Sequence, residues 1–138
     1  GMVIGGHSDT GMIPLTRLAT RNSVPVSKFI SEERMEEVKQ ETKVGGATLT
    51  KLLGTSAWYA PGAAVSAMVQ AIANDSKKMF PCSCLLEGEY GLNDICIGVP
   101  TLIGAKGVES IVEIELTESE KAELASSADA VRKTNSLL

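Results

Sequence analysis

Short runs of apolar residues recur along the chain, and their spacing separates strands from helices. Compact runs rich in valine, isoleucine and leucine are typical of strands that are buried on at least one face. In residues 111–116 the apolar side chains alternate with glutamates, which is the pattern of a strand with one face in water. We expect the main strands at 3–4, 12–15, 79–86, 95–103 and 111–116, with shorter extended pieces at 16–22 and 24–26.

Two helices are predicted in the middle of the chain. Ser31 is placed to cap the start of the first helix, since serine is a favoured N-cap residue. The two glutamates after it also favour a helix start there, because negative charge is stabilised at the positive end of the helix dipole. Gly45-Gly46 is expected to end or kink this helix, and a helical pattern resumes over 47–53 until Gly54 breaks it. The second helix, over 63–73, is apolar on nearly every side. That pattern indicates a helix buried at the centre of a domain or at an interface.

A third helix closes the chain. Thr117 and Glu120 have the spacing of a capping box, which marks the helix start. The apolar stripe of this helix consists of Leu124, Ala128 and Val131. Together the elements predict an α+β fold, in which helices pack against a twisted, largely antiparallel sheet. The 138 residues suffice for a single domain, and they contain no internal repeat.

Charge and hydropathy exclude several classes of partner. The chain has 13 Lys+Arg against 17 Asp+Glu, a formal net charge of -4, and no basic cluster. We therefore expect neither a nucleic acid nor an anionic membrane as a partner. No segment resembles a signal peptide or a membrane span, so the expected location is cytoplasmic.

Cysteine spacing and glycine spacing argue against two kinds of site. Cys82 and Cys84 would share one face of a strand, and Cys96 leaves the count odd. No second Cys/His pair completes a zinc site, so we expect buried reduced thiols and no metal. Neither a G-x-G-x-x-G sequence nor a Walker-type loop occurs, so the usual nucleotide cradle is not in this chain.

The strongest candidate for chemistry is His7, the only histidine of the chain. It follows a short β-branched run and two glycines, which allow a tight backbone turn. A strand that delivers an imidazole to the edge of a loop can present a general acid or base. The alternative is that His7 is structural or simply solvated.

A second informative stretch runs from Gly54 to Gly62. Small residues dominate it, interrupted by Trp58, the only tryptophan, and by Tyr59. Pro61 suits the first turn of the helix that follows. For Trp58 a place in the core or a subunit interface is favoured over contact with a ligand.

Six motifs stand in a fixed order: Gly5-Gly6-His7-Ser8-Asp9, Met12-Ile13-Pro14-Leu15, Gly54 through Pro61, Glu87-Gly88-Glu89-Tyr90-Gly91, Gly98-Val99-Pro100 and Gly107-Val108-Glu109. This order resembles the C-terminal half of the lactate/malate dehydrogenase family over essentially the whole chain, and it looks most like the malate-type members. Two departures stand out, because Ser8 replaces a usual glycine and Gly11 looks like an extra residue. If that glycine needs a positive φ, Ser8 would strain the His7 loop.

The resemblance implies interconversion of malate and oxaloacetate, in which the hydride at C2 of malate is transferred to NAD. His7 would be the catalytic proton acceptor and donor. Ser56 and Ala57 would line the substrate pocket, and Pro61 would lie near the nicotinamide of the cofactor. An N-terminal Rossmann domain, absent from this chain, would bind most of the NAD. It would also supply the aspartate partner of the histidine and the arginines that clamp the substrate, so we expect the chain alone to be inactive.

Several alternatives stay open. Ordinary packing at a helix start would equally explain Ser56 and Ala57. The substrate could be lactate or another 2-hydroxy acid, although alanine at position 57 favours a larger dicarboxylate. A non-catalytic interaction module that keeps the fold is the rival outside enzymology. An apolar face left by a missing domain also predicts a homo-oligomer.

Overall fold

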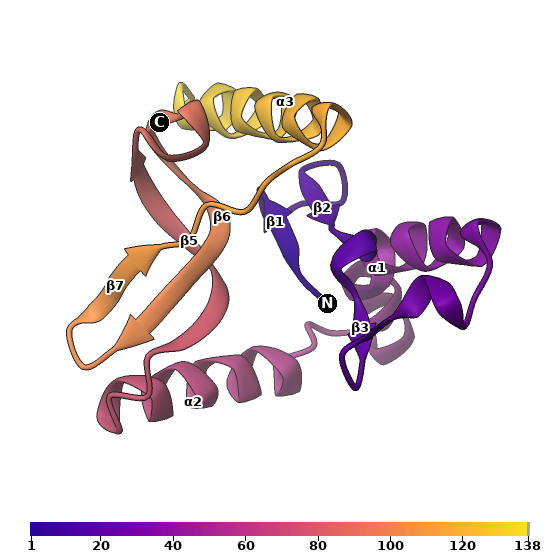
Figure 1. The fold of residues 1–138 in the computed structure, drawn as a ribbon, viewed down its shortest axis with the longest axis horizontal. Coiled ribbons are helices and arrows are strands. Elements are labelled where there is room, and N and C mark those ends of the chain that lie inside the picture. The colour runs from indigo at the N-terminus through magenta and orange to yellow at the C-terminus, as the bar shows by residue number, and fades with distance from the viewer. Residues whose placement is uncertain (138) are drawn as a thin grey trace.

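Two long antiparallel strands, β5 (Lys78–Glu87) and β6 (Asn93–Gly104), form the middle of the fold (Figure 1). The computed structural model describes residues 1–137. The other edge of β6 pairs with β1 (Val3–Gly5) and with β7 (Gly107–Ile111), and β2 (Met12–Pro14) pairs with β1. Every one of these pairings is antiparallel. The predicted α+β class with an antiparallel sheet is confirmed.

The strand predicted at 111–116 is wrong in its position. β7 already ends at Ile111, and it is followed by one further backbone hydrogen bond to β6, from the N–H of Val112 to the carbonyl of Pro100 at 2.8 Å. The hydroxyl of Tyr90 replaces the missing strand partner: it donates to the carbonyl of Val112 at 2.7 Å and accepts from the N–H of Ile114 at 3.0 Å. The alternation of buried and exposed side chains therefore continues over 112–116 without strand pairing, because the Tyr90 side chain satisfies backbone hydrogen-bonding groups there.

The extended pieces predicted at 16–22 and 24–26 are only partly confirmed. Asn22 and Ser23 have φ angles of 49° and 66° and form the two-residue turn of a small hairpin. The flanking parts of both predicted pieces are instead single turns of 3₁₀ helix. The elements in order are a 3₁₀ turn (Thr16–Leu18), β3 (Thr20–Arg21), β4 (Val24–Pro25) and a second 3₁₀ turn (Val26–Lys28).

Helix α3 (Glu118–Asn135) covers one side of the sheet (Figure 1). Its predicted capping box is present in full. The Thr117 Oγ1 accepts from the N–H of Glu120 at 3.2 Å, and the Glu120 carboxylate accepts from the N–H of Thr117 at 2.9 Å. The same carboxylate pairs with Arg17 at 2.8 Å. One glutamate thus fixes the helix start and ties it to the first third of the chain.

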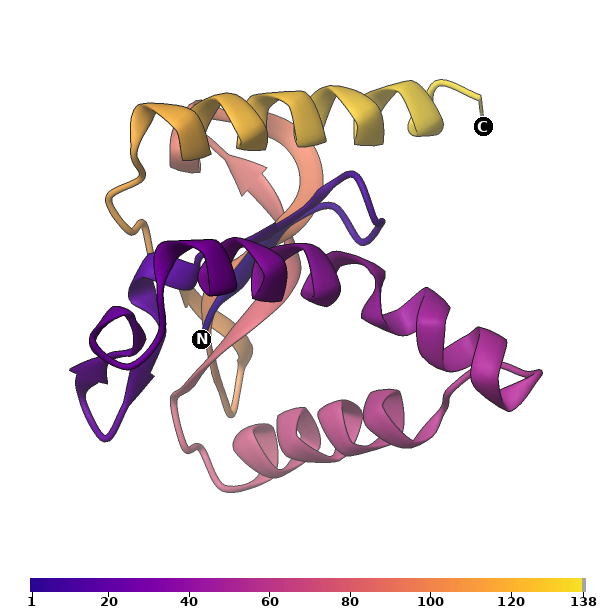
Figure 2. The same ribbon diagram turned by 90° about the vertical axis from the view of Figure 1, so that its right-hand side faces the viewer.

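Helix α1 (Glu32–Leu53) begins and ends as predicted but is not interrupted. The Ser31 side chain accepts from the N–H of Arg34 at 3.2 Å, and Gly54 ends the helix with a φ of 69°. The helix continues through Gly45-Gly46, and Figure 2 shows its ribbon changing direction along its length. The prediction that these glycines end the helix is therefore wrong, and a bend is the surviving alternative.

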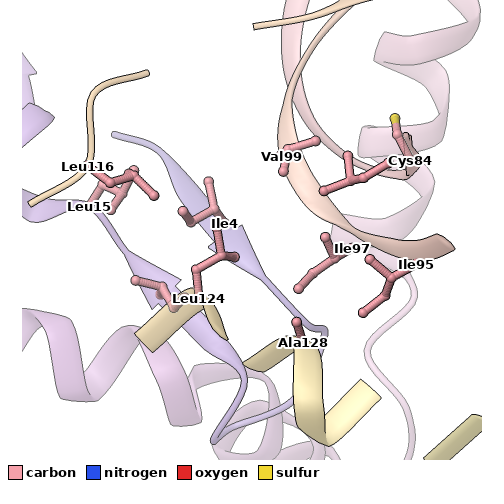
Figure 3. Close-up of a cluster of buried hydrophobic side chains, with 11 residues drawn as sticks. Ile4, Leu15, Cys84, Ile95, Ile97, Val99, Leu116, Leu124 and Ala128 are labelled. Atoms are coloured by element: carbon pink, nitrogen blue, oxygen red, sulfur yellow. The ribbon is translucent and has the colours of Figure 1, made fainter. Parts of the chain in front are cut away.

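The core lies between the sheet and α3 (Figure 3). Its members are contributed by β1, β2 and the residue after it, β5, β6, α3 and the segment just before α3. They are Ile4, Ile13, Leu15, Cys84, Leu86, Ile95, Ile97, Val99, Leu116, Leu124 and Ala128. Helix α1 contributes no buried residue, and helix α2 (Tyr59–Ala73) contributes only Ala71. The apolar α2 is therefore not at the centre of this domain, which leaves the interface alternative.

The three cysteines differ in burial. Cys84 is buried, Cys82 is half-buried and Cys96 is exposed, and all three thiols are free. The expectation of buried thiols is confirmed in full only for Cys84. It is wrong for Cys96, because its neighbours Ile95 and Ile97 face the core and alternation turns Cys96 outward. Burial raises the pKa of the Cys82 thiol.

Two kinds of feature are absent from residues 1–137. No cluster of His, Cys, Asp and Glu side chains in this range could hold a metal ion. No helix in this range is long and apolar enough to span a membrane.

Candidate active site

The single histidine lies on the loop that joins β1 to β2. β1 ends at Gly5, whose φ of 93° lies in the left-handed region, and the chain turns there into residues 6–11. The His7 side chain is exposed on this loop. Its expected placement, at a loop edge directly after a strand, is what the structure has.

Ser8 stabilises the turn after His7 and does not strain it. Its Oγ accepts from the N–H of Gly11 at 2.9 Å, and its carbonyl accepts from the N–H of Met12 at 3.0 Å. Ser8 does not have a positive φ, so the strain considered above is absent. A Cβ at Gly11 would lie 2.8 Å from the Ser8 Oγ. Ser8 and Gly11, the two departures from the family pattern, therefore stabilise the same turn: Ser8 accepts a hydrogen bond from Gly11, and glycine leaves room for the Ser8 hydroxyl.

His7 borders a cavity of about 500 Å³ that is lined by its loop, by β1, β5 and β6, and by one residue of α3. Gly98 on β6 lies opposite Gly5 in the strand register, and a Cβ at Gly98 would lie 2.7 Å from the Gly5 carbonyl oxygen. Glycine is therefore needed where the two strands meet, and this close pairing brings the loop against the sheet. The other walls include Met12, Pro81, Ser83, Cys96 and Val131.

The walls of this cavity are mostly apolar. No Lys, Arg, Asp or Glu lines it, so His7 is the titratable group there besides the Cys96 thiol. An imidazole at such a wall can take a proton from a hydroxyl group in the cavity, or return one. The walls offer no cation for a carboxylate, so a carboxylate ligand needs positive charge from outside them.

Three of the four arginines are engaged away from the cavity. Arg17 pairs with Glu120 at 2.8 Å, and Arg34 pairs with Glu37 at 2.7 Å. Arg132 donates to a backbone carbonyl of β6 at 3.0 Å. None of the three lines the cavity at His7. That the arginines of the chain are not substrate clamps stays a prediction.

The other predicted site residues lie on the arm formed by α1 and α2. Ser56 and Ala57 are in the connection between the two helices, and Pro61 is in the first turn of α2. Ser56 and Pro61 are exposed, whereas Ala57 is half-buried. None of them lines the cavity at His7. Figure 2 shows this connection and the β1–β2 loop on the same side of the molecule, at the right.

The sequence pattern missed Ser127, which contacts the loop from α3. Ser127 is 3% exposed, and its Oγ lies 2.8 Å from both the amide nitrogen of Gly6 and the carbonyl oxygen of Gly11. The available signal was a serine directly before Ala128 in the apolar stripe of the last helix. A polar side chain buried in such a stripe needs a hydrogen-bond partner.

Comparison with protein families gives one match over nearly the whole chain. Residues 2–136 match the family model described as lactate/malate dehydrogenase, alpha/beta C-terminal domain. The matched range includes the His7 loop, the α1–α2 connection and helix α3.

Relatives and solved structures agree with that match. The chain is 64% identical over 138 residues to a malate dehydrogenase of Bacteroides thetaiotaomicron, covering all of this chain and 44% of the relative. A malate dehydrogenase structure from Salinibacter ruber is 47% identical with a TM-score of 0.91, over 95% of this chain and 43% of that one. A lactate dehydrogenase structure from Eimeria maxima with NADH and oxamate is 39% identical with a TM-score of 0.94, over 99% and 43%. The chain thus spans less than half the length of the relatives it matches.

Proposed function

Because the chain belongs to the lactate/malate dehydrogenase family and corresponds to its alpha/beta C-terminal domain, we propose that it forms the substrate-binding half of an NAD-dependent malate dehydrogenase. In this proposal residues 1–138 are one domain, and a dinucleotide-binding Rossmann domain packs beside it. The observation that carries the proposal is the exposed imidazole of His7 at the wall of an otherwise uncharged cavity.

His7 is the proton acceptor for malate oxidation in this proposal. The C2 hydroxyl of malate must lose its proton as the C2 carbon loses a hydride, and an imidazole within hydrogen-bond reach can accept that proton. In the reverse direction the protonated imidazole donates to the carbonyl oxygen of oxaloacetate and stabilises the negative charge that develops there. The open side of the cavity at His7 is where the reacting carbon would lie.

NAD supplies the hydride acceptor when it is bound. Residues 1–138 do not fit the whole cofactor, because they contain no glycine-rich phosphate cradle. We therefore assign most NAD binding to the neighbouring Rossmann domain, with Pro61 near the nicotinamide. The uncharged cavity walls likewise leave the substrate carboxylates to arginines of that domain.

Malate is favoured over lactate by two observations. The relatives with 62–64% identity are malate dehydrogenases, whereas a lactate dehydrogenase structure is 39% identical. Ala57 also has a small side chain, which leaves room for a dicarboxylate if it and Ser56 line the substrate pocket. In this proposal the protein surface that packs on α1 and α2 determines how close Ser56 and Ala57 come to the cavity.

Steady-state turnover tests the proposal. The full-length protein that carries this chain should reduce NAD with malate and do so much faster than with lactate. The 138-residue chain alone should show no measurable turnover, because its cavity has no cation for the substrate and its sequence has no NAD cradle. Turnover by the chain alone would contradict the assignment of NAD binding and of the substrate-binding arginines to the other domain. A full-length protein that turns over no 2-hydroxy acid would favour the non-catalytic interaction module instead.

A further inference from the structure

Ser127 is buried beneath the loop that carries His7, 120 positions away in sequence. We propose that Ser127 is a positioning residue, whose hydroxyl holds both ends of this loop and so sets where the imidazole stands. The inference rests on the proposed function for its effect on catalysis, but the placement of the loop can be measured separately.

One hydroxyl group closes the loop. The Ser127 Oγ accepts a hydrogen bond from the N–H of Gly6 at 2.8 Å, and the same hydroxyl donates to the carbonyl of Gly11 at 2.8 Å. Gly6 directly precedes His7, and Gly11 directly precedes β2. Both hydrogen bonds are buried. The two ends of the loop are therefore tied to a single atom.

Glycines allow this close approach. A Cβ at Gly6 would lie 3.3 Å from the Ser127 Oγ, and one at Gly5 or at Gly11 would lie 3.2 Å from it. The Gly6 position is also restricted by Val131, whose Cγ2 would lie 3.1 Å from such a Cβ. Three glycines thus surround one hydroxyl, and larger residues there would push the loop away from α3.

The core fixes the position of the hydroxyl itself. Leu124 and Ala128, on the same face of α3, are 3% and 0% exposed and belong to the main core cluster. The capping box at Thr117 holds the start of this helix. Ser127 therefore extends from a closely packed part of α3, and its hydroxyl positions the loop relative to the core.

Loss of the hydroxyl has a specific expected consequence. In Ser127→Ala the N–H of Gly6 and the carbonyl of Gly11 both lose a buried partner, so the loop should shift until water or another group satisfies them. A shift on the order of 1 Å in a catalytic group can cost about 100-fold in rate. We expect turnover to fall roughly 10- to 100-fold while NAD binding is unchanged.

The test compares three variants of the full-length protein that carries this chain. Ser127→Ala removes the hydroxyl, Ser127→Thr retains it, and Ser126→Ala is the matched control, because Ser126 is the exposed neighbour on the same helix. Hydrogen exchange of the peptide 3–12 reports on the loop. Turnover of malate, with its isotope effect for malate deuterated at C2, reports on the chemical step. Thermal unfolding confirms that each variant is folded at the assay temperature.

The expected result is faster exchange in 3–12, lower turnover and a larger isotope effect for Ser127→Ala, with Ser126→Ala unchanged. Ser127→Thr, which keeps the hydroxyl, should lie closer to the wild type. If Ser127→Ala does not fold, Ser127→Cys, whose thiol is a weaker hydrogen-bonding group of similar size, replaces it with the same expected changes. Equal exchange and turnover in all variants would overturn the inference. So would a loss that follows the folded fraction with an unchanged isotope effect, because that describes a purely structural residue. If the wild type turns over no malate, the proposed function fails, and the exchange comparison alone decides whether Ser127 holds the loop.

Discussion

The two halves of the molecule use apolar residues in opposite ways. In the sheet and α3, which we call the core unit, side chains such as Leu86 and Val99 are 0% exposed. In α1 and α2, which we call the helical arm, apolar side chains stay in water, with Leu52 78% and Val65 61% exposed. The helical arm is nevertheless tied to the core unit, since Lys39 of α1 pairs with Glu123 of α3 at 3.3 Å.

This difference shows which part of the site the chain builds by itself. The loop of His7 belongs to the core unit, where hydrogen bonds and close packing fix it. Ser56, Ala57 and Pro61 belong to the helical arm, whose apolar surface is uncovered in this chain. Extended apolar surface of this kind is typical of contact with another protein surface. The chain therefore places the proposed catalytic group, His7, by itself, whereas we expect the remaining predicted contacts to depend on a partner surface.

The largest expected effect comes from deleting a core side chain. Leu86→Ala should lower the free energy of unfolding by about 2–5 kcal/mol, because it leaves a cavity among fully buried neighbours. Val69→Ala in α2 should change it by less than about 0.5 kcal/mol, because Val69 is 56% exposed. Urea unfolding of the 138-residue chain measures both. Similar losses in the two variants would break the distinction between core unit and helical arm.

An intermediate effect is expected at the start of α3. Glu120→Gln should lower the free energy of unfolding by about 1 kcal/mol, because the carboxylate caps the helix and pairs with Arg17. Glu118→Gln is the control, since its side chain is 90% exposed in the same turn, and it should cost a few tenths of a kcal/mol. Unfolding in urea at neutral pH distinguishes the two.

The same glutamate gives the core unit a pH dependence. The hydrogen bond from Arg17 lowers the pKa of Glu120 below its ordinary value. A carboxylate with a lowered pKa in the folded state stabilises the fold fully above its unfolded pKa, and this stabilisation is lost as pH falls through the folded pKa. The difference between the wild type and Glu120→Gln should therefore shrink in acid. A difference that does not change between pH 7 and acid would contradict the ion pair.

The smallest expected effect on stability is also the sharpest test of the helical arm. Val69→Lys should leave the free energy of unfolding of the 138-residue chain within about 0.5 kcal/mol, because the side chain is already exposed. It should, however, weaken self-association, since a charge is placed on the surface that we expect to pair. Light scattering should give a dimer or larger species for the wild-type chain and a smaller mean mass for the variant. A monomeric wild type would count against the predicted homo-oligomer.

Local chemistry explains which elements could be predicted from the sequence. The caps at Ser31 and Thr117 depend on residues within one turn, so spacing along the chain reveals them. The strand predicted after Ile111 is wrong because the side chain of Tyr90, more than 20 positions away, bonds the carbonyl of Val112 and the N–H of Ile114 in place of a strand. The periodicity of apolar residues indicates which side chains are buried, but it does not indicate which groups form hydrogen bonds with the backbone N–H and C=O groups.

The candidate site divides in the same way. The His7 loop could be predicted because a strand, two glycines and the only histidine are adjacent in sequence. Ser127 could not, because its role arises only when α3 folds back onto that loop across 121 positions. The roles of Ser56, Ala57 and Pro61 stay predictions from the family resemblance.

The most direct measurement concerns the imidazole of His7. In the full-length protein that carries this chain, His7→Asn should lower the turnover of malate by about 100- to 10,000-fold, the usual range for a lost general base. Binding of NAD, measured by calorimetry, should be unchanged, since the cofactor is assigned mainly to the other domain. Turnover close to that of the wild type, in a variant shown to be folded, would contradict the central claim that His7 moves the proton.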